Sequence, residues 1–510
     1  MTLRLAGVTR WPMGVTRWLA GTTRRRAVVA AIAVALGLAV LASRLPFLAT
    51  TLWSWDSVLY ARALERGFHV DFDLADQRPH APGYLFYVLA AAAFRGLLGD
   101  SNAALVAVSA VASALGTAGL FLFARQLART WIALLAACAY AAAPLVWAYS
   151  EVAFPYSLLG ALSIGLAALF WAARRRPVQW VIAASVALGL AAGFRQDLLM
   201  LLGPLWLWTV AGRGRRVTLA AGAAVAAASL TWLVPTALLS DGPGEYLDAL
   251  AAQAGRVGEQ YSAVLQGLPA FTFNLQTTLY ALLWGGIGAG LLGAAIAAWL
   301  FAGGARLSGP LAWFLALWVL PGLLFYVVVH IGDWGYVSSL LPALYLALAI
   351  LAERAIAAGR IPSLRWRAVG AAVALAPALL FLLGTDRFSA AAVREHDAAI
   401  TQRTAYMRAH FVPAETIILA REDFLTARYY LPEYRAWRYD PPPHERRMMQ
   451  RWRPWRATNV VVFTNGLEPR SANDVRVIRV APRIRICQLT IQPGDIVELT
   501  GHHYRIRDAL

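Results

Sequence analysis

Apolar runs of about 20 residues recur along most of this chain, and they limit what it can fold into. A run of that length crosses the hydrocarbon core of a bilayer as a single helix. The composition agrees, because 59% of the residues are hydrophobic and 15% are charged, whereas a soluble domain has about 25% charged residues. The sequence therefore predicts an α-helical polytopic membrane protein and excludes an ordinary soluble globule.

We predict about eleven transmembrane helices. Their approximate ranges are 27–49, 102–124, 131–149, 155–173, 178–192, 198–211, 217–239, 277–302, 311–330, 337–352 and 368–385. Residues 1–26 are rich in arginine and are predicted to form a basic cytoplasmic tail. The transmembrane domain is accordingly predicted to extend from residue 27 to residue 385.

The apolar run 84–98 decides the topology. It is short, contains Arg95 and begins just after Pro82-Gly83. If this run lies along the membrane without crossing it, several arginine clusters fall on the same, cytoplasmic side, as the positive-inside rule requires. These clusters are Arg125/Arg129, Arg174–Arg176 and Arg213/Arg215/Arg216. We therefore predict a juxtamembrane helix, and we attribute the net charge of +18 to topology rather than to a nucleic-acid partner.

The tail 386–510 is more polar and is predicted to be a soluble extracytoplasmic α/β domain. Alternating apolar residues indicate strands near 415–420, 460–464, 475–480, 484–491, 495–499 and 503–507. Residues 435–456 are predicted to be irregular. The tail has no glycine-rich phosphate loop and no metal-ligand spacing. Cys138 lies in an apolar run and Cys487 in the tail, so no disulfide is indicated.

The first outward loop, 50–101, contains the strongest candidate for chemistry. Asp56 follows two tryptophans at the membrane interface, and it fits a general base as well as it fits the N-cap of the next helix. Arg78 and His80 could bind a phosphate, or they could belong to a solvated turn. Asp71 and Asp73 in the same loop are predicted to be solvated carboxylates.

Other polar residues lie next to apolar runs on the same side. Arg195 and Asp197 either line a substrate cavity or form a structural ion pair, and Glu151 has the same two interpretations. Asp333 and Tyr336 either line that cavity or belong to an interfacial aromatic belt.

The order of these features resembles the GT-C superfamily of integral-membrane glycosyltransferases. An acidic residue just beyond the first span is followed by an amphipathic helix and then by HAPGY at residues 80–84. AAPLVWAYSEVAFPYSLLGALS and LGLAAGFRQDLLMLLGPL resemble later segments of these enzymes. The most similar groups are bacterial relatives of protein O-mannosyltransferases and the lipid A aminoarabinose transferase, which are family 39-like. The resemblance covers residues 1–355.

The resemblance implies a GT-C-like fold and an enzyme in the cytoplasmic membrane. Such an enzyme would transfer a sugar from a polyprenyl-phosphate donor to a lipid, glycan or protein hydroxyl on the extracytoplasmic face, with inversion. Asp56 matches the catalytic Asp of the family, and Arg195 with His80 or Arg78 would bind the donor phosphate. Neither a cofactor nor a metal is implied. The chain departs from the family at two positions. Many relatives have Glu where this chain has Ser57, and the family has an Arg before the Tyr where this chain has Gly335 before Tyr336.

A multi-span transporter or lipid flippase is the alternative function. Buried arginines and acids would then line a pathway for substrate. Transporters often contain internal repeats or paired broken helices, and no clear repeat is visible in this sequence. The sequence indicates membrane lipids as surroundings and identifies neither the sugar, the acceptor nor the oligomeric state.

Overall fold

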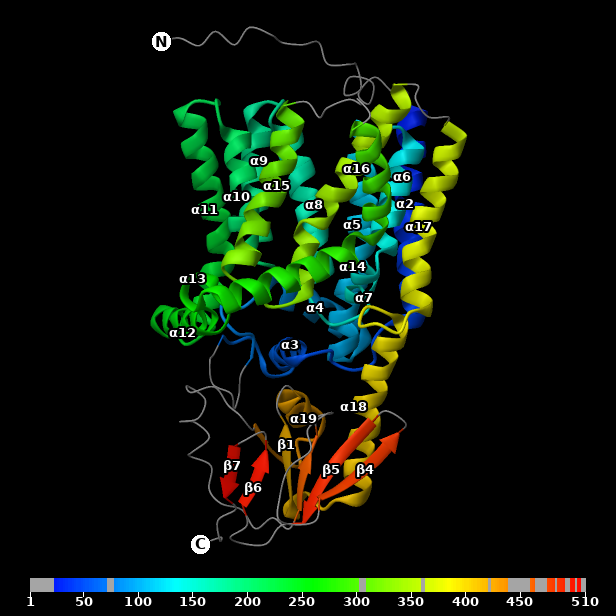
Figure 1. Ribbon diagram of the computed structural model, residues 1–510. Coiled ribbons are helices and arrows are strands. Elements are labelled where there is room, and N and C mark those ends of the chain that lie inside the picture. The colour runs from blue at the N-terminus through cyan, green and yellow to red at the C-terminus, as the bar shows by residue number, and fades with distance from the viewer. Residues whose placement is uncertain are drawn as a thin grey trace.

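The computed structural model describes residues 23–70, 78–301, 309–358, 363–420, 423–438, 459–463, 475–481, 484–490, 496–499 and 502–505. Most of these residues are helical. A bundle of long helices forms one part of the molecule, and a small domain with a sheet lies beyond one end of the bundle (Figure 1). The basic tail predicted at 1–26 lies largely outside the described residues, and so do Asp71 and Asp73.

Within the described residues, every predicted apolar run is mostly helical, although 131–149 is divided between α6 (Thr130–Ala142) and α7 (Pro144–Tyr149). The bundle contains α2 (Thr23–Arg44), α5 (Ser101–Leu127), α6 (Thr130–Ala142), α8 (Tyr156–Ala173), α9 (Val178–Ala191), α10 (Asp197–Val210), α11 (Arg215–Leu238), α14 (Leu268–Phe301), α15 (Gly309–Val328), α16 (Leu341–Ala357) and α17 (Ser363–Leu383). Within the described ranges, six helical stretches are long and apolar enough to cross a membrane, and several apolar helices are shorter. The chain is therefore a mostly helical, multi-span membrane protein.

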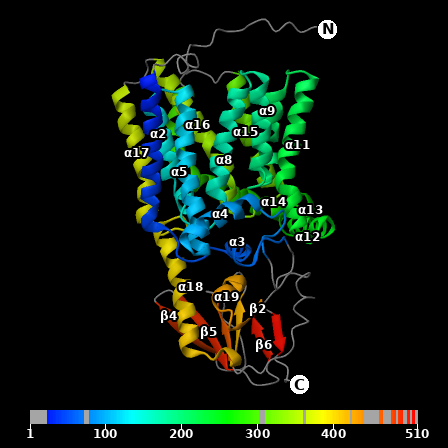
Figure 2. The ribbon, with the colours of Figure 1, turned by 180° about the vertical axis from the view of Figure 1, so that it is seen from behind.

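Short helices gather at the end of the bundle that faces the sheet domain (Figures 1 and 2). They are η1 (Leu45–Phe47), α3 (Trp55–Arg66), α4 (Leu85–Leu98), α7 (Pro144–Tyr149), α12 (Pro243–Tyr261), α13 (Ala263–Gln266) and η2 (Trp334–Ser339). Gly83 makes the turn into α4 at a φ of +109°, and a Cβ there would lie 2.7 Å from Val70. A glycine is therefore required where the loop enters α4.

The C-terminal domain contains a mixed five-stranded sheet. Its elements are α18 (Ala390–His410), η3 (Pro413–Glu415), β1 (Thr416–Ala420), α19 (Phe424–Tyr430), β2 (Arg435–Arg438), β3 (Asn459–Val462), β4 (Val475–Ala481), β5 (Ile484–Thr490), β6 (Ile496–Leu499) and β7 (His502–Arg505). The strand order is β2-β1-β3-β5-β4, and β6 pairs with β7 separately. β1 is parallel to β2 and β3, whereas β5 is antiparallel to β3 and β4. The prediction that 435–456 is irregular was wrong for β2, whose parallel pairing with β1 is a contact that local sequence does not reveal.

One apolar core joins the segment that contains Leu52 and α3 to the C-terminal domain. Leu52 and Val58 belong to the same buried cluster as Met407 of α18, Ile418 of β1 and Leu425 of α19. The change in composition near residue 386 therefore does not coincide with a boundary between two separate cores. Burial of these side chains holds α3 and α19 against each other.

Candidate active site

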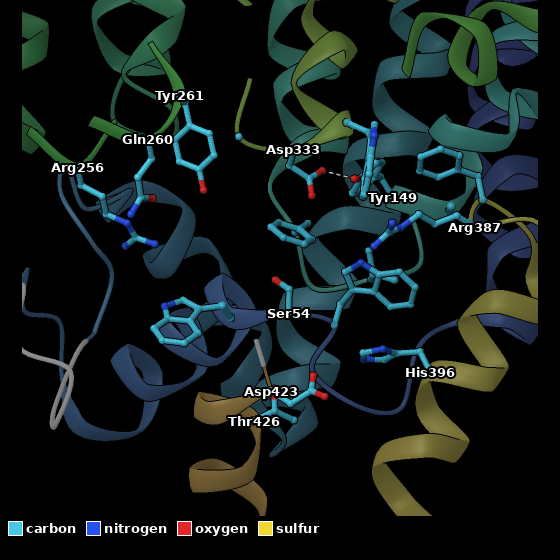
Figure 3. A pocket seen from close by; sticks show the side chains of 18 of the residues that line it. Ser54, Tyr149, Arg256, Gln260, Tyr261, Asp333, Arg387, His396, Asp423 and Thr426 are labelled. Carbon is cyan, nitrogen blue, oxygen red and sulfur yellow. Dashed lines mark hydrogen bonds between the residues drawn. The ribbon is translucent and has the colours of Figure 1, made fainter. Parts of the chain in front are cut away.

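A cavity of about 580 Å³ lies where the bundle meets the C-terminal domain (Figure 3). The bundle and its loops contribute aromatic, cationic and acidic side chains to the lining, and the C-terminal domain contributes polar ones. These residues include Trp53, Ser54, Trp55, Tyr149, Arg256, Gln260, Tyr261, Asp333, Trp334, Arg387, His396, Asp423, Thr426 and Arg438. The Trp53-Ser54-Trp55 segment brings the start of α3, and with it Asp56, to the edge of this cavity.

Asp56 is in the first turn of α3, but it is not the N-cap. Ser54 is the N-cap, with extended backbone at φ −155°, and Asp56 is the second residue of the helix. The N-cap interpretation was therefore wrong, because Trp55 already has helical geometry. A carboxylate in the first turn is still favoured by the positive end of the helix dipole. Its side chain is 32% exposed, so a substrate can reach it.

His80 is the charged partner of Asp56. The Nε2 atom of His80 lies 3.6 Å from Oδ1 of Asp56, and its Nδ1 donates to the carbonyl of Ala81 at 2.7 Å. Burial by itself raises the pKa of Asp56, but the nearby His80 brings it below the ordinary value. Burial by itself lowers the pKa of His80, but Asp56 raises it above the ordinary value. The pair therefore favours a carboxylate beside an imidazolium.

Arg195 is buried and already paired. Its Nε and Nη2 donate to the two carboxylate oxygens of Asp197 at 3.2 and 2.7 Å. Its guanidinium also lies 5.5 Å from the ring centre of Tyr84, 5.2 Å from that of Tyr156 and 4.9 Å from that of Tyr336. With 3% of its side chain exposed, Arg195 is packed among these three tyrosines, and two of its five N–H groups donate to Asp197.

Asp333 lines the cavity and caps η2. Its Oδ1 accepts from the backbone N–H of Gly335 at 2.9 Å and also from the hydroxyl of Tyr149. Burial raises the pKa of Asp333 to about 6. Tyr336 lies one turn further along, against Arg195. The structure thus brings Asp333 to the cavity, while Tyr336 stays in the aromatic surroundings of Arg195.

Glu151 and Arg78 lie apart from the cavity lining. Glu151 is fully buried and accepts from Nε1 of Trp147 at 2.5 Å, and Arg44 stacks over the same tryptophan at 4.1 Å. Nη1 of Arg78 donates to the carbonyls of Arg66 and Gly67 at 3.0 and 3.1 Å. Arg78 therefore holds the C-terminal end of α3, where helix carbonyls have no intrahelical partner.

Arg256 is a site residue that sequence reasoning missed. It comes from α12 and lines the cavity, and it makes no hydrogen bond or ion pair within the described ranges. Its charge contributes to the lowered pKa of Asp56, after that of His80. The available signal was an arginine in an amphipathic outward helix, since Tyr246 and Ala249 form the buried face of α12.

Arg387 lines the cavity on the side away from Arg256 (Figure 3). Its guanidinium stacks on the ring of Trp334 at 3.9 Å.

Across the described part of the chain, no three His, Cys, Asp or Glu side chains gather closely enough to hold a metal ion. The cavity therefore combines separated cations, carboxylates and aromatic faces, which suits a substrate that carries both a phosphate and a sugar.

Comparison with known proteins identifies the architecture. No protein-family model and no curated protein matches the chain. ArnT from Cupriavidus metallidurans bound to undecaprenyl phosphate matches 92% of this chain and 98% of its own, with 15% identity and a TM-score of 0.53. The chain has the ArnT fold. The apo form of ArnT matches 90% of this chain and 97% of its own, with 16% identity and a TM-score of 0.56.

The match to ArnT spans both parts of the molecule, because it covers nearly the whole of each chain. It includes the multi-span helical bundle together with the small C-terminal domain. The prediction of a multi-span helical membrane domain with a C-terminal α/β domain is therefore confirmed, and the fold is that of ArnT. At 15–16% identity the ArnT fold is what the two proteins share, and the chemistry has to be argued from the residues of this chain.

Proposed function

We propose that this protein is a membrane glycosyltransferase that uses a polyprenyl-phosphate-linked sugar. The observation that carries the proposal is geometric: the partly exposed Asp56 lies 3.6 Å from His80 and directly follows the Trp53-Ser54-Trp55 segment of the cavity lining. Arg256 projects into the same cavity (Figure 3). The structure of ArnT with undecaprenyl phosphate supports this class of donor. The acceptor is a hydroxyl group of a lipid, glycan or protein.

In the proposed reaction, Asp56 accepts the proton of the acceptor hydroxyl as that oxygen attacks the anomeric carbon. The bond between this carbon and the phosphate oxygen breaks, and the polyprenyl phosphate leaves with the electron pair. Attack opposite the leaving group inverts the configuration. Asp56 is suited to this role because it is ionised, partly exposed and oriented by His80.

Arg256 is the best placed cation for the phosphate of the donor. Arg195 has committed two of its donor atoms to Asp197, and Arg78 donates to helix carbonyls. Arg256 has its donors available at the cavity. A cation held at the leaving group stabilises the charge that develops on it. Arg195 then acts indirectly, by fixing the tyrosines behind the site.

We further propose that the cavity faces the extracytoplasmic side. About eleven of the helices would then cross the membrane, with α4 lying along its surface. The arginines that follow α5, α8 and α10 lie in loops at the other ends of these helices from Ser101, Tyr156 and Asp197. The positive-inside rule assigns such loops to the cytoplasm.

Reporter fusions test this orientation. Fusions after Arg129, Arg176 and Arg216 should be active with a cytoplasmic reporter, and a fusion after Phe388 should be active with an exported one. An exported signal at Arg129 would mean that α4 crosses the membrane, which would invert every later loop.

Mass spectrometry of envelope glycolipids and glycans tests the activity. A deletion strain should lack a sugar substituent that its parent carries, and the wild-type gene should restore it. A transporter or flippase would form no glycosidic bond itself and would change the distribution of a lipid or solute across the membrane. Unchanged glycans together with altered transport would contradict the proposed function.

A further inference from the structure

The segment 48–54 delivers Asp56 to the cavity without regular secondary structure of its own. It connects η1 with α3, and the described backbone from Leu48 to Ser54 contains no helix or strand. Its position therefore depends on side chains that bond to its backbone. Several of these side chains come from α18 and α19, more than 340 residues further along the chain.

Asp397 of α18 makes the densest set of these bonds. Its Oδ2 accepts from the backbone N–H of Thr50 at 2.7 Å. Its Oδ1 accepts from the N–H of Thr51 at 3.0 Å and from the Thr51 hydroxyl at 2.6 Å. Both carboxylate oxygens thus face donors, and charge-assisted bonds of this kind are the stronger hydrogen bonds in proteins.

Leu52 is held at both of its backbone polar groups. Its N–H donates to the hydroxyl of Tyr430 at 2.8 Å, and its carbonyl lies 3.2 Å from Nε2 of His396. The His396 ring also packs on Trp53, with their centres 4.5 Å apart. The Leu52 side chain is completely buried in the core shared with the C-terminal domain. The segment is therefore bonded and packed just before α3 begins.

We propose that Asp397, together with His396 and Tyr430, positions the segment that carries the catalytic Asp56. The C-terminal domain is then an integral part of the active site, and not a separate module attached to a complete enzyme. This inference rests on the proposed function for Asp56. The bonds themselves are independent of that function, so each can be tested without the other.

The expected consequence is a loss of rate without a loss of donor affinity. Asp56 is four residues beyond Leu52, and a displacement of about 1 Å at a reacting group can reduce a rate by about a hundredfold. The proposed phosphate ligand, Arg256, belongs to α12, and the bonds of Asp397 do not hold that helix. Loosening the segment should therefore affect kcat more than KM.

Asp397→Asn is the main test, because its amide NH₂ would face one of the N–H donors. We expect kcat for transfer to fall about tenfold, while undecaprenyl phosphate binds within about twofold of wild type. Amide hydrogen exchange, measured by mass spectrometry, should become faster across residues 50–56. Glu415→Gln is the matched control, since Glu415 is an exposed carboxylate of the same domain without a side-chain partner in the described ranges.

Thr51 provides a second, milder pair of variants. Thr51→Val removes the hydroxyl bond to Asp397 and keeps the shape of the side chain, so kcat should fall by a few fold. Thr51→Ser retains the hydroxyl and should recover most of that loss.

Two outcomes would overturn the inference. One is unchanged exchange and unchanged kcat in Asp397→Asn. The other is equal loss of kcat, undecaprenyl phosphate affinity and thermal stability, which would indicate a merely structural role. If wild-type protein binds no undecaprenyl phosphate, the proposed function fails instead, and hydrogen exchange still decides whether Asp397 holds the segment.

Discussion

Replacing Asp56 by asparagine should reduce sugar transfer by about a hundred- to ten-thousandfold, which is the usual contribution of a general base. An amide does not accept a proton near neutral pH, so the acceptor hydroxyl would lose its base. Arg256, the proposed phosphate ligand, belongs to α12 and should keep its position. Asp56→Asn should therefore still bind undecaprenyl phosphate, and single-turnover transfer by purified protein would show the loss directly.

The stability of this variant should change little. Ser54, not Asp56, occupies the N-cap position of α3, and the favourable interaction of a first-turn carboxylate with a helix dipole is about 0.3–1 kcal/mol. His80 loses its charged partner, and its pKa should fall back because Asp56 is what raises it. Thermal unfolding of both proteins in the same detergent would measure this difference.

Asp241→Asn is the matched control for Asp56→Asn. Asp241 also faces a histidine, with its Oδ2 2.9 Å from Nε2 of His69, but its side chain is 77% exposed. Its φ of +59° is one that asparagine tolerates. This control should retain wild-type transfer. Wild-type turnover in Asp56→Asn, with the true donor and acceptor, would end the assignment of Asp56 as the base.

The bundle could be predicted from the sequence because one physical constraint dominates it. A helix that crosses a bilayer needs a long apolar run, and such runs are visible without knowledge of tertiary contacts. The strands of the C-terminal domain were predicted for a similar reason, since β1 and β3 are short apolar runs. β2 was missed because an Arg- and Trp-rich segment becomes a strand through its pairing with β1.

The site was predicted in part. Asp56 and His80 were both candidates in the predicted loop 50–101, but the sequence assigned them separate roles, and their proximity comes from the structure. Arg78 and Glu151 are charged residues of the kind that bind substrates, but the sequence does not reveal their hydrogen-bond partners. In the structure Arg78 donates to helix carbonyls, and Glu151 accepts from Trp147.

Contacts between segments that are far apart in the chain could not be predicted from the sequence. Arg256 reaches the same cavity as Trp55 from a helix two hundred residues later in the chain, and Asp397 bonds to Thr50 across 347 residues. No periodicity or motif links such positions. From sequence alone Asp397 looks like any solvated acid of an amphipathic helix, and its role depends on where the C-terminal domain docks.

Arg256→Ala should weaken the binding of undecaprenyl phosphate by about ten- to a hundredfold. A hydrogen bond to a charged group contributes about 1.5–3 kcal/mol, which corresponds to this range of affinity. Arg256→Lys should recover part of the loss, because lysine keeps the charge but cannot make a bidentate contact with a phosphate. Equilibrium binding of undecaprenyl phosphate to purified protein would measure both changes.

The control for this prediction is Arg216→Gln, which removes one positive charge from an exposed position near the start of α11. It should bind undecaprenyl phosphate as wild type does. Arg256→Ala should also raise the pKa of Asp56, because the charge of Arg256 is one of the causes that lower it. Asp56 would then take up its proton at a higher pH, so the acid limb of the pH–rate profile for transfer should shift to higher pH. Wild-type affinity in Arg256→Ala would mean that the donor phosphate binds elsewhere in the cavity, with Arg387 as the next cation to test.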